Sequence, residues 1–434
     1  MIFIVKPASA LNGKIQLPAS KSYSIRSFII AACGGYSTIM NPSNCEDARV
    51  SIRVARLLGA QVKRTQKNEA VRWEVVAHKY PPRISKINVK ESGTVLRFLL
   101  PILILHQKKS VIDGEGTLRA RPNVFLTTTL RRLGIDIRGK GKQERVPIHM
   151  NGGSFKGGNI VTDGSLSSQF ISGLLITCPQ LMRDSHLLLK GRKLVSIDYI
   201  TMTCQILNKC GIKFEKRGLR DFRIKGNQRF KGLKKFMVPS DYGLAAFPMA
   251  AAILSKSDVT LTGCLNDELI QADGHIIPLL KKMGVNIHKT SKSIRIKGPH
   301  ALRGGNFSLK NCPDLVPVMS ILALFAKGRT RLYDISHVRS KESDRISDLR
   351  RELLKVGAKI SEKKDSLTIE PRSKYKTDCL LDPHKDHRLA MAFCVLGSKL
   401  GARVKDIECT RKSYPDFVRD FKSIGILGSQ KIHF

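Results

Sequence analysis

The chain has 434 residues, too many for one compact core, and this length predicts two large domains. Its 76 Lys and Arg stand against 35 Asp and Glu, a formal net charge of +41. The longest uncharged apolar runs, residues 98–106 and 245–254, are too short to cross a bilayer. The opening residues alternate like a strand and do not resemble a secretory signal. We therefore expect a cytoplasmic protein with no membrane segment.

The positive charge allows three interpretations. A basic surface is typical of nucleic-acid binding, because it releases the counterions of phosphates. However, the Lys and Arg are spread over the whole length, and aromatic residues are only 6% with one Trp, which leaves few platforms for base stacking. A Lys-rich solvated surface is the simpler interpretation. Part of the charge could also steer small anionic substrates into a cleft.

Strand-like and helix-like segments alternate from the N-terminus onward. Strand-like alternation in IFIVKP, GKIQLP and RWEVVAH interleaves with helical segments such as SIRSFIIAAC and TVLRFLLPILILH. Interleaved strands and helices of similar number predict an α/β fold. The chain interrupts its pattern at Pro239 and Gly243, just before the apolar segment AAFPMAAAIL, and we place a domain boundary there.

A helix-like segment ending in glycine and followed by a strand-like one occurs six times. The segments are ARLLGAQV, LRRLGIDI, LNKCGIKF, LKKMGVNI, LLKVGAKI and FKSIGIL, and their glycines are 68 to 77 residues apart. Glycine directly after a helix is favoured because it adopts positive φ at little cost. The spacing therefore predicts six copies of one helix-to-strand unit, three in each half, with a ligand cleft between halves.

Common cofactor and metal motifs are absent from the sequence. It contains no GxxxxGK[ST] and no complete GxGxxG, so no nucleotide-binding loop is expected. His384 and His387 are three residues apart without further ligands nearby, and we expect no metal site. The ten cysteines include no CxxC pair, which indicates reduced, mostly buried thiols rather than a disulfide framework.

In the first half, polar motifs stand at expected helix starts. In LPASKSYSIRSF, Ser20 or Ser22 can cap a helix whose first turn carries Lys21 and Arg26. Lys and Arg beside free helix N–H groups make an anion site, although an ordinary capped helix would look the same. Gly93 in ESGTVLRF would let a ligand approach the backbone, or would simply belong to a cap turn.

Two further motifs complete the first half. DGSLSSQF places hydroxyl and amide groups before an apolar helix, which suits a hydroxylated, phosphorylated ligand or only a helix cap. RARPNVF carries Arg119 and Arg121, which fit either a phosphate or carboxylate clamp or a solvated turn.

The second half supplies most of the charged partners. In SKESDR, Glu342 and Arg345 have the i,i+3 spacing of a helical salt bridge. Asp314 begins an apolar helix, where a carboxylate can serve as an N-cap. DPHKDHRLAM places Asp386, His387 and Arg388 before another apolar helix, and Lys412 precedes a Tyr-Pro pair. Together these motifs predict acid–base chemistry on small phosphate- and carboxylate-bearing substrates without a metal.

With these motifs, the chain resembles the 5-enolpyruvylshikimate-3-phosphate (EPSP) synthase family over nearly its whole length. SKSYSIR is similar to that family's SKSxSxR motif, SGTVLR to its SGTxxR loop, and GSLSSQF to its GSxSSQF motif. KESDR resembles KExDR, DHRLAM resembles DHRxAM, and RKSYPDF resembles the K[ST][FY]P[DE]F ending. The motifs also occur in the family's order.

The resemblance implies two similar domains, each of three βαβαββ repeats in an inside-out α/β barrel, with the active site in the interdomain cleft. The domains would be residues 17–238, on the shikimate-phosphate side, and residues 1–16 with 239–434, on the phosphoenolpyruvate side. The reaction would transfer the enolpyruvyl group of phosphoenolpyruvate to the 5-hydroxyl of 3-phosphoshikimate and release phosphate. No cofactor, metal or specific nucleic-acid partner is implied, and a monomer is expected.

The resemblance also assigns roles residue by residue. Asp314 would be the base on the 5-hydroxyl, and Glu342 and Lys21 would donate the proton to C3. Phosphoenolpyruvate would be held by Lys21, Arg121, Arg345, Arg388 and Lys412, with Gly93 against it. The shikimate substrate would be held by Ser22, Arg26, Ser167, Ser168, Gln169, Ser196, Tyr199, His337 and Lys341. Several cations suit these substrates, because guanidinium stays charged at any working pH.

Four departures from the family pattern put individual contacts in question. Glu91 replaces a common Asn, Phe98 a common Pro, and His337 a common Asn, while SDYGLAAF lacks the usual serines. The family is a glyphosate target, and tolerant members have Ala where this chain has Gly93. Three rivals remain: an enolpyruvyl transferase acting on UDP-N-acetylglucosamine, a basic nucleic-acid-binding protein on a related repeat fold, and an inactive paralogue.

Overall fold

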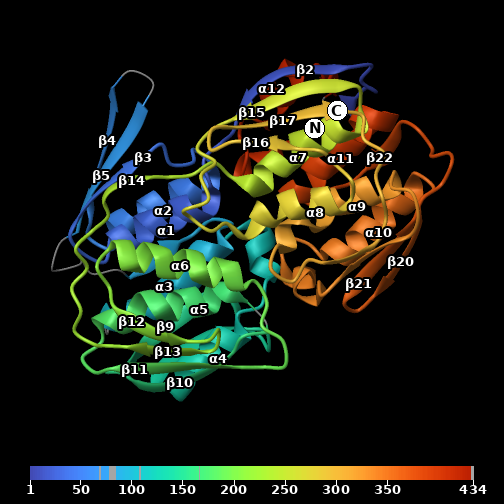
Figure 1. Ribbon diagram of the computed structural model, residues 1–434. Coiled ribbons are helices and arrows are strands. Elements are labelled where there is room, and N and C mark those ends of the chain that lie inside the picture. Colours follow the sequence, from blue (N-terminus) through green and yellow to red (C-terminus); the bar gives the residue numbers. More distant parts are fainter. Residues whose placement is uncertain (68–69, 78–84, 107–108, 166, 432–434) are drawn as a thin grey trace. The chain divides into compact units, whose positions relative to one another are not determined.

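The computed structural model describes the whole chain except residues 68–69, 78–84, 107–108, 166 and 432–434. The chain forms two compact units (Figure 1). One unit, called here the C-unit, consists of Met1–Pro18 and Pro239–Phe434; the other, the N-unit, is Ala19–Val238. The chain therefore leaves the C-unit at Pro18 and returns to it at Pro239.

One repeat shows how both units are built. It runs β6 (Lys86–Asn88), α3 (Gly93–Ile102), β7 (Ser110–Asp113), α4 (Val124–Arg132), β8 (Ile135–Lys140) and β9 (Arg145–Gly153). The strands lie in the order β6-β7-β9-β8, with the first pair parallel and the others antiparallel. In the described part of the chain there are six sheets, each with four strands in this same spatial order, which confirms the predicted six copies of a βαβαββ unit.

In the N-unit, the last strand of the unit completes the first sheet. Strand β14 (Lys234–Met237) pairs in parallel with β3, beside β5 and β4. This first repeat comprises α1 (Lys21–Ala31), β3 (Tyr36–Met40), α2 (Glu46–Leu57), β4 (Gln61–Lys67) and β5 (Ala70–Val76). The third comprises β10 (Gly158–Asp163), α5 (Ser168–Thr177), β11 (Ser185–Lys190), α6 (Ile197–Lys209), β12 (Phe214–Arg217) and β13 (Asp221–Ile224).

In the C-unit, the N-terminal segment contributes to two sheets. Strand β2 (Leu11–Gln16) opens the first repeat, with α7 (Tyr242–Leu254), β15 (Ser257–Thr262), α8 (Ile276–Lys282), β16 (His288–Lys289) and β17 (Ser293–Gly298). The next comprises β18 (Asn306–Ser308), α9 (Val316–Leu324), β19 (Thr330–Tyr333), α10 (Arg345–Lys355), β20 (Lys359–Lys363) and β21 (Ser366–Glu370). Strand β1 (Ile2–Val5) completes the last, with β22 (Cys379–Leu381), α11 (His387–Leu400), β23 (Ala402–Lys405), α12 (Phe417–Ser423) and β24 (Gly428–Lys431).

The six predicted helix-ending glycines all have positive φ. Their φ angles lie between 80° and 100°, at Gly59, Gly134, Gly211, Gly284, Gly357 and Gly425. Each follows the second helix of its repeat and precedes a strand. A side chain at these angles would strain the backbone, so glycine is required where the chain reverses from helix to sheet.

The first helix of each repeat forms the core, and the sheets lie outside it (Figure 1). Every residue of α7 and α9 is buried, as are nine of eleven in α1. The second helices are amphipathic instead: α10 buries six of eleven residues, and its other side carries exposed charges. This inside-out arrangement agrees with the expected α/β fold, although the described strands form six separate sheets rather than one closed barrel.

No helix among the described residues is long and apolar enough to span a bilayer. Over the same part of the chain, no group of three or more His, Cys, Asp or Glu has the arrangement of a metal site. All ten cysteines are free in the structure, and six of them are buried, as expected for mostly buried thiols.

Candidate active site

The predicted residues of the N-unit lie in or near the first turns of α1, α3, α5 and α6. Lys21 is the first residue of α1, and its Nζ lies 3.2 Å from a carboxylate oxygen of Asp47. The Ser20 hydroxyl caps the helix by accepting from the Tyr23 N–H at 3.4 Å, so Ser20 rather than Ser22 is the cap. Lys21 is held beside the positive end of the helix by Asp47, an acid that the sequence analysis did not assign.

Arg26 is a buried cation that joins helices α1 and α6. Its Nε donates to the Thr203 hydroxyl at 2.9 Å, and its two other nitrogens donate to the carbonyls of Ser22 and Tyr199 at 3.0 Å. The guanidinium lies 5.2 Å from the centre of the Phe98 ring, which gives that departure from the family pattern a packing role. Burial lowers the pKa of Arg26 to about 10, so it remains charged at neutral pH.

Gly93 and Arg121 lie against one another. Gly93 begins α3, and a Cβ built on it would be 2.7 Å from Nη1 of Arg121. Arg121 is 5% exposed, whereas Arg119 is exposed and bonds the carbonyl of Gly114. Of the two arginines in the RARPNVF motif, Arg121 is therefore the buried one that lies at a helix N-terminus, where an anion is favoured.

Arg97 organises this part of the unit and was not among the predicted site residues. It donates to Gln169 Oε1 at 2.6 Å, to Asn123 Oδ1 at 3.4 Å and to the Pro122 carbonyl at 3.2 Å. Gln169 in turn donates to the Thr94 hydroxyl at 2.9 Å, which ties the N-termini of α5 and α3 together. One sequence signal pointed to it: Arg97 is the only charged residue in the apolar helix GTVLRFLLPI, where an unpaired charge would be costly.

Glu91, the acid that departs from the family pattern, has a structural role here. Its Oε2 accepts from the backbone N–H of Thr117 at 3.0 Å and from the Thr117 hydroxyl at 2.7 Å. Thr117 lies in the short helix Gly116–Ala120 that leads into Arg121. Glu91 therefore stabilises the segment that carries Arg121.

The predicted hydroxyl ligands lie at two further helix starts. Ser167 caps α5 by accepting from the Gln169 N–H at 3.3 Å, and Ser168 is the first residue of that helix. Leu166 of the same motif lies outside the described residues. Ser196 precedes α6 with φ 55° and ψ 37°, a left-handed conformation that is uncommon for serine and often marks a functional site. Tyr199 follows in the first turn of α6.

In the C-unit, Arg345 binds three carboxylates. It donates to Asp314 at 2.7 Å, to Glu342 at 3.1 Å and to Asp386 at 2.8 Å, and its side chain is 1% exposed. Burial by itself lowers the pKa of this guanidinium, but Asp386, Asp314 and Glu342 raise it well above its usual value. Arg345 thus brings the predicted base and a predicted acid to one permanent cation.

Arg388, in the first turn of α11, links Asp314 to helix α7. It donates to Asp314 Oδ2 at 3.0 Å and to the Gly243 carbonyl of α7 at 2.7 Å. In the altered SDYGLAAF motif, Asp241 caps α7 by accepting from the Leu244 N–H at 3.0 Å. The helix start is therefore intact without the serines that the family usually has there.

The remaining predicted residues of the C-unit lie around these acids. Lys412 Nζ is 3.8 Å from Glu342 Oε1, and Lys341 Nζ is 4.0 Å from Asp314 Oδ1. Both ring nitrogens of His337 are shielded from solvent, with no hydrogen-bond partner among the described residues. Burial, together with nearby Lys341, lowers the pKa of His337 to about 3, so it is neutral at physiological pH.

Two local expectations for this unit are corrected. Asp314 lies in a 3-10 turn, Pro313–Leu315, and does not cap α9; two arginines hold its carboxylate instead. Glu342 precedes α10, which begins at Arg345, so their contact is not a surface pair on a helix. Both side chains are at most 10% exposed. Packing against other segments overrides the local pattern.

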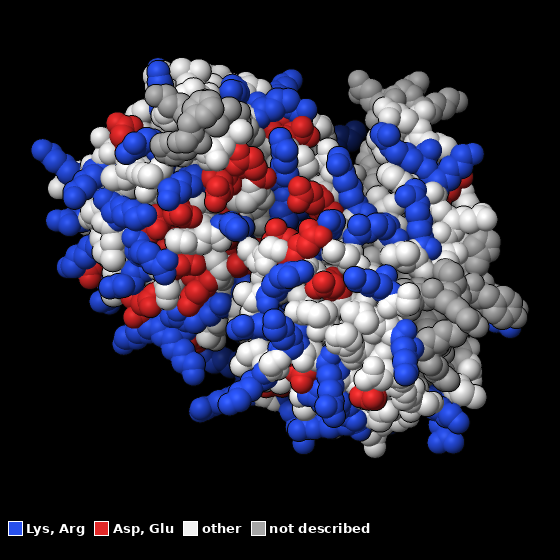
Figure 2. All heavy atoms as spheres, turned by 180° about the vertical axis from the view of Figure 1, so that it is seen from behind, with Lys and Arg blue, Asp and Glu red and all other residues white. Residues whose placement is uncertain are grey.

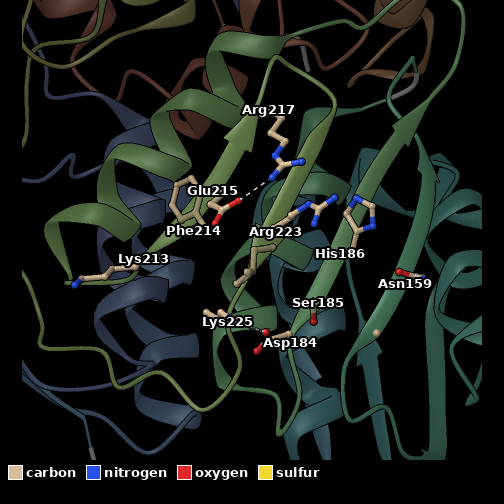
Figure 3. A pocket seen from close by; sticks show the side chains of 12 residues that line it. Asn159, Asp184, Ser185, His186, Lys213, Phe214, Glu215, Arg217, Arg223 and Lys225 are labelled. Carbon is tan, nitrogen blue, oxygen red and sulfur yellow. Dashed lines mark hydrogen bonds and ion pairs between the residues drawn. The ribbon is translucent and has the colours of Figure 1, made fainter.

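A cavity of about 690 Å³ lies on the sheet β10–β13 of the N-unit (Figure 3). Four cations and two acids are among its lining residues. Two of the cations are paired, Lys225 with Asp184 at 2.7 Å and Arg217 with Glu215 at 3.6 Å. The cavity contains none of the predicted site residues, and we do not assign the catalytic chemistry to it.

The charged side chains are spread over the face of the molecule that Figure 2 draws. Figure 2 shows Lys and Arg across the whole visible face, with Asp and Glu between them. They form no single basic stripe on the described part of this face.

Comparison with known proteins gives the class first. The chain has the fold of the enolpyruvyl transferases: it matches the transferase NikO from Streptomyces tendae with a TM-score of 0.77 at 16% identity, over 99% of this chain and 98% of that one. It matches an EPSP synthase from Acinetobacter baumannii with a TM-score of 0.79 at 26% identity, over 99% and 100%.

The sequence comparisons then give the family. The profile of EPSP synthase (3-phosphoshikimate 1-carboxyvinyltransferase) matches residues 5–421. A 3-phosphoshikimate 1-carboxyvinyltransferase of Methanococcus aeolicus is 36% identical, covering 98% of this chain and 99% of the relative. One of Methanocaldococcus jannaschii is 34% identical, covering 98% of each. The chain belongs to the EPSP synthase family, as its motifs indicated.

Proposed function

We propose that this protein transfers the enolpyruvyl group of phosphoenolpyruvate to the 5-hydroxyl of 3-phosphoshikimate. The products are 5-enolpyruvylshikimate 3-phosphate and inorganic phosphate, a step of the shikimate pathway toward aromatic amino acids. Family membership supports the reaction. Among the side chains, the observation that carries it is Arg345, which holds Asp314 and Glu342 on one guanidinium.

The chemistry is an addition followed by an elimination. Asp314 takes the proton of the 5-hydroxyl while that oxygen attacks C2 of phosphoenolpyruvate, and Glu342 or Lys21 protonates C3. Phosphate then leaves the tetrahedral intermediate as C3 loses a proton. The guanidinium groups of Arg345 and Arg388 beside Asp314 favour its ionised form, which a base requires.

The substrates divide between the cations and hydroxyls described above. In the C-unit, Arg345, Arg388 and Lys412 hold phosphoenolpyruvate, with Lys21, Gly93 and Arg121 from the N-unit. The shikimate phosphate is held by Ser22, Arg26, Ser167, Ser168, Gln169, Ser196, Tyr199 and Lys341, and His337 contacts the same substrate. Buried cations at helix N-termini support this assignment, since both features favour phosphate and carboxylate groups. We also propose that the protein acts as a cytoplasmic monomer.

Phosphate release with different acceptors tests the proposed function. Purified protein is given phosphoenolpyruvate with either 3-phosphoshikimate or UDP-N-acetylglucosamine, and a coupled assay follows phosphate. Turnover with 3-phosphoshikimate alone is expected. Turnover only with the sugar nucleotide would assign a different enolpyruvyl transfer, and folded protein without turnover with either acceptor would indicate an inactive paralogue. Size-exclusion chromatography with light scattering tests the monomer.

A further inference from the structure

The turn that leads into α11 has an unusual backbone. His384 and Lys385 have φ of 50° and 59°, and the Asp386 N–H donates to the Pro383 carbonyl at 2.8 Å. Positive φ at both central residues is the mirror-image turn that Gly and Asn favour. Residues with a full side chain adopt it where the surrounding structure holds them there.

Glu352 of α10 is the group that holds this turn. Its side chain is 1% exposed, its Oε2 accepts from the Asp382 N–H at 2.8 Å, and its Oε1 lies 3.2 Å from Nε2 of His384. Lys355 also bonds this carboxylate. The carboxylate of Asp382 accepts from the His384 N–H at 2.8 Å. A buried carboxylate needs such a set of donors, and here they come mainly from the turn.

The same turn ends in the residue that binds Arg345. Asp386 is fully buried and accepts from Arg345 Nε and from the Arg388 N–H, each at 2.8 Å. Glu352 follows Arg345 by seven residues, about two helical turns, so both lie on one side of α10. Helix α10 therefore holds the segment 382–388 at two points, through Arg345 at its start and through Glu352 further along.

We propose that Glu352 and His384 are positioning residues that fix Asp386 and Arg388 for the reaction. Neither is assigned a contact with substrate, and each acts through the turn. This inference rests on the proposed function, in which Arg388 binds phosphoenolpyruvate and bonds Asp314. Releasing the turn therefore weakens the use of phosphoenolpyruvate and leaves the binding of 3-phosphoshikimate largely intact, because most of the residues that hold the latter belong to the N-unit.

Two glycine variants in the same turn test the proposal. His384→Gly removes the imidazole, whereas Lys385→Gly changes the neighbouring, exposed residue and keeps the imidazole. Both relieve positive φ, so a purely backbone effect would be alike in the two. We expect kcat/KM for phosphoenolpyruvate to fall about 10- to 100-fold in His384→Gly. The KM for 3-phosphoshikimate should stay within about twofold, in line with that assignment. Lys385→Gly should match the wild type, and His384→Gln should recover part of the loss.

Hydrogen exchange gives a readout independent of activity. The Asp382 and Asp386 amides should be protected in the wild type and in Lys385→Gly, and should exchange faster in His384→Gly. Equal exchange in both variants, or faster exchange with unchanged kinetics, would overturn the positioning role. If the wild type shows no turnover, the proposed function fails, and exchange alone still decides whether His384 holds the turn.

Discussion

Gly93 has no side chain at the point where the guanidinium of Arg121 reaches the N-terminus of α3, 2.7 Å from where a Cβ would stand. The absence of a Cβ thus makes room for a cation of this protein as well as for a ligand. The position of Arg121 depends on the size of residue 93.

Gly93→Ala is expected to displace Arg121 without unfolding the protein. Alanine favours a helix more than glycine does, so the thermal midpoint should not fall. We expect the KM for phosphoenolpyruvate to rise about tenfold, equivalent to about 1.4 kcal/mol of binding. Lysine at position 121 lacks the guanidinium that the alanine Cβ would crowd. In the double variant with Arg121→Lys, Gly93→Ala should therefore raise the KM less than it does alone. Independent, additive effects would show that the two residues are not coupled.

Removing Arg345 should leave three carboxylates without their common cation. We expect Arg345→Met to lower the free energy of unfolding by about 3–5 kcal/mol. Turnover should fall about 10²–10³-fold, as when a preorganised electrostatic group is lost. Urea denaturation and phosphate release measure the two effects.

Arg351→Met is the matched control for that variant, because Arg351 lies on the same helix but its side chain is 57% exposed. Its change in unfolding free energy should stay within about 0.5 kcal/mol. Similar losses in both variants would contradict the role given to Arg345.

His337 should make the protein less stable in mild acid. Its pKa is lowered to about 3 in the folded chain, below the ordinary 6.5, so the unfolded chain binds the extra proton first. The stability that neutral His337 contributes to the folded chain is fully present above pH 6.5 and is lost as the pH falls toward 3. Between pH 7 and pH 5, the wild type should lose up to about 2 kcal/mol of unfolding free energy more than His337→Asn does. Parallel stability curves for the two proteins would show that His337 does not titrate in this way.

Arg97 should matter for the shikimate substrate although it was not predicted as a site residue. Arg97→Lys keeps the charge but cannot make all three bonds, so Gln169 loses its orientation. The KM for 3-phosphoshikimate should rise roughly 10- to 100-fold, because about 1.5–3 kcal/mol of binding free energy is lost. The exposed Arg132→Lys is the control and should behave as the wild type. An unchanged KM in Arg97→Lys would refute the role of Gln169.

The sequence predicts well those features that depend on one residue and its neighbours. Positive φ at a helix end requires glycine at a single position, and all six glycines predicted to end helices have that conformation. Which strands pair cannot be read locally: β14 joins β3, and β1 joins β23 and β24, across most of the chain. The repeats in the sequence indicate the βαβαββ units, but strands that pair across most of the chain become neighbours only in the folded structure.

In the candidate site too, the sequence predicts the residues but not their distant partners. The motifs indicated which charged residues matter, but the partners of Arg345 are 31 and 41 residues away in Asp314 and Asp386. The short spacing to Glu342 is typical of a helical salt bridge, whereas the structure shows a buried contact with Glu342 outside the helix. Local spacing carries no information about burial when the partners come from other helices.

The most direct test of the account is turnover by Asp314→Asn beside the wild type. Phosphate release and the vinyl proton signals of the product are followed with phosphoenolpyruvate and 3-phosphoshikimate. Asp258→Asn, at an exposed ion pair with Arg295, is the control. We predict product formation by the wild type and the control, and a loss of about 10²–10⁴-fold in Asp314→Asn. Turnover by Asp314→Asn at the wild-type rate, or none by folded wild type, would contradict the account.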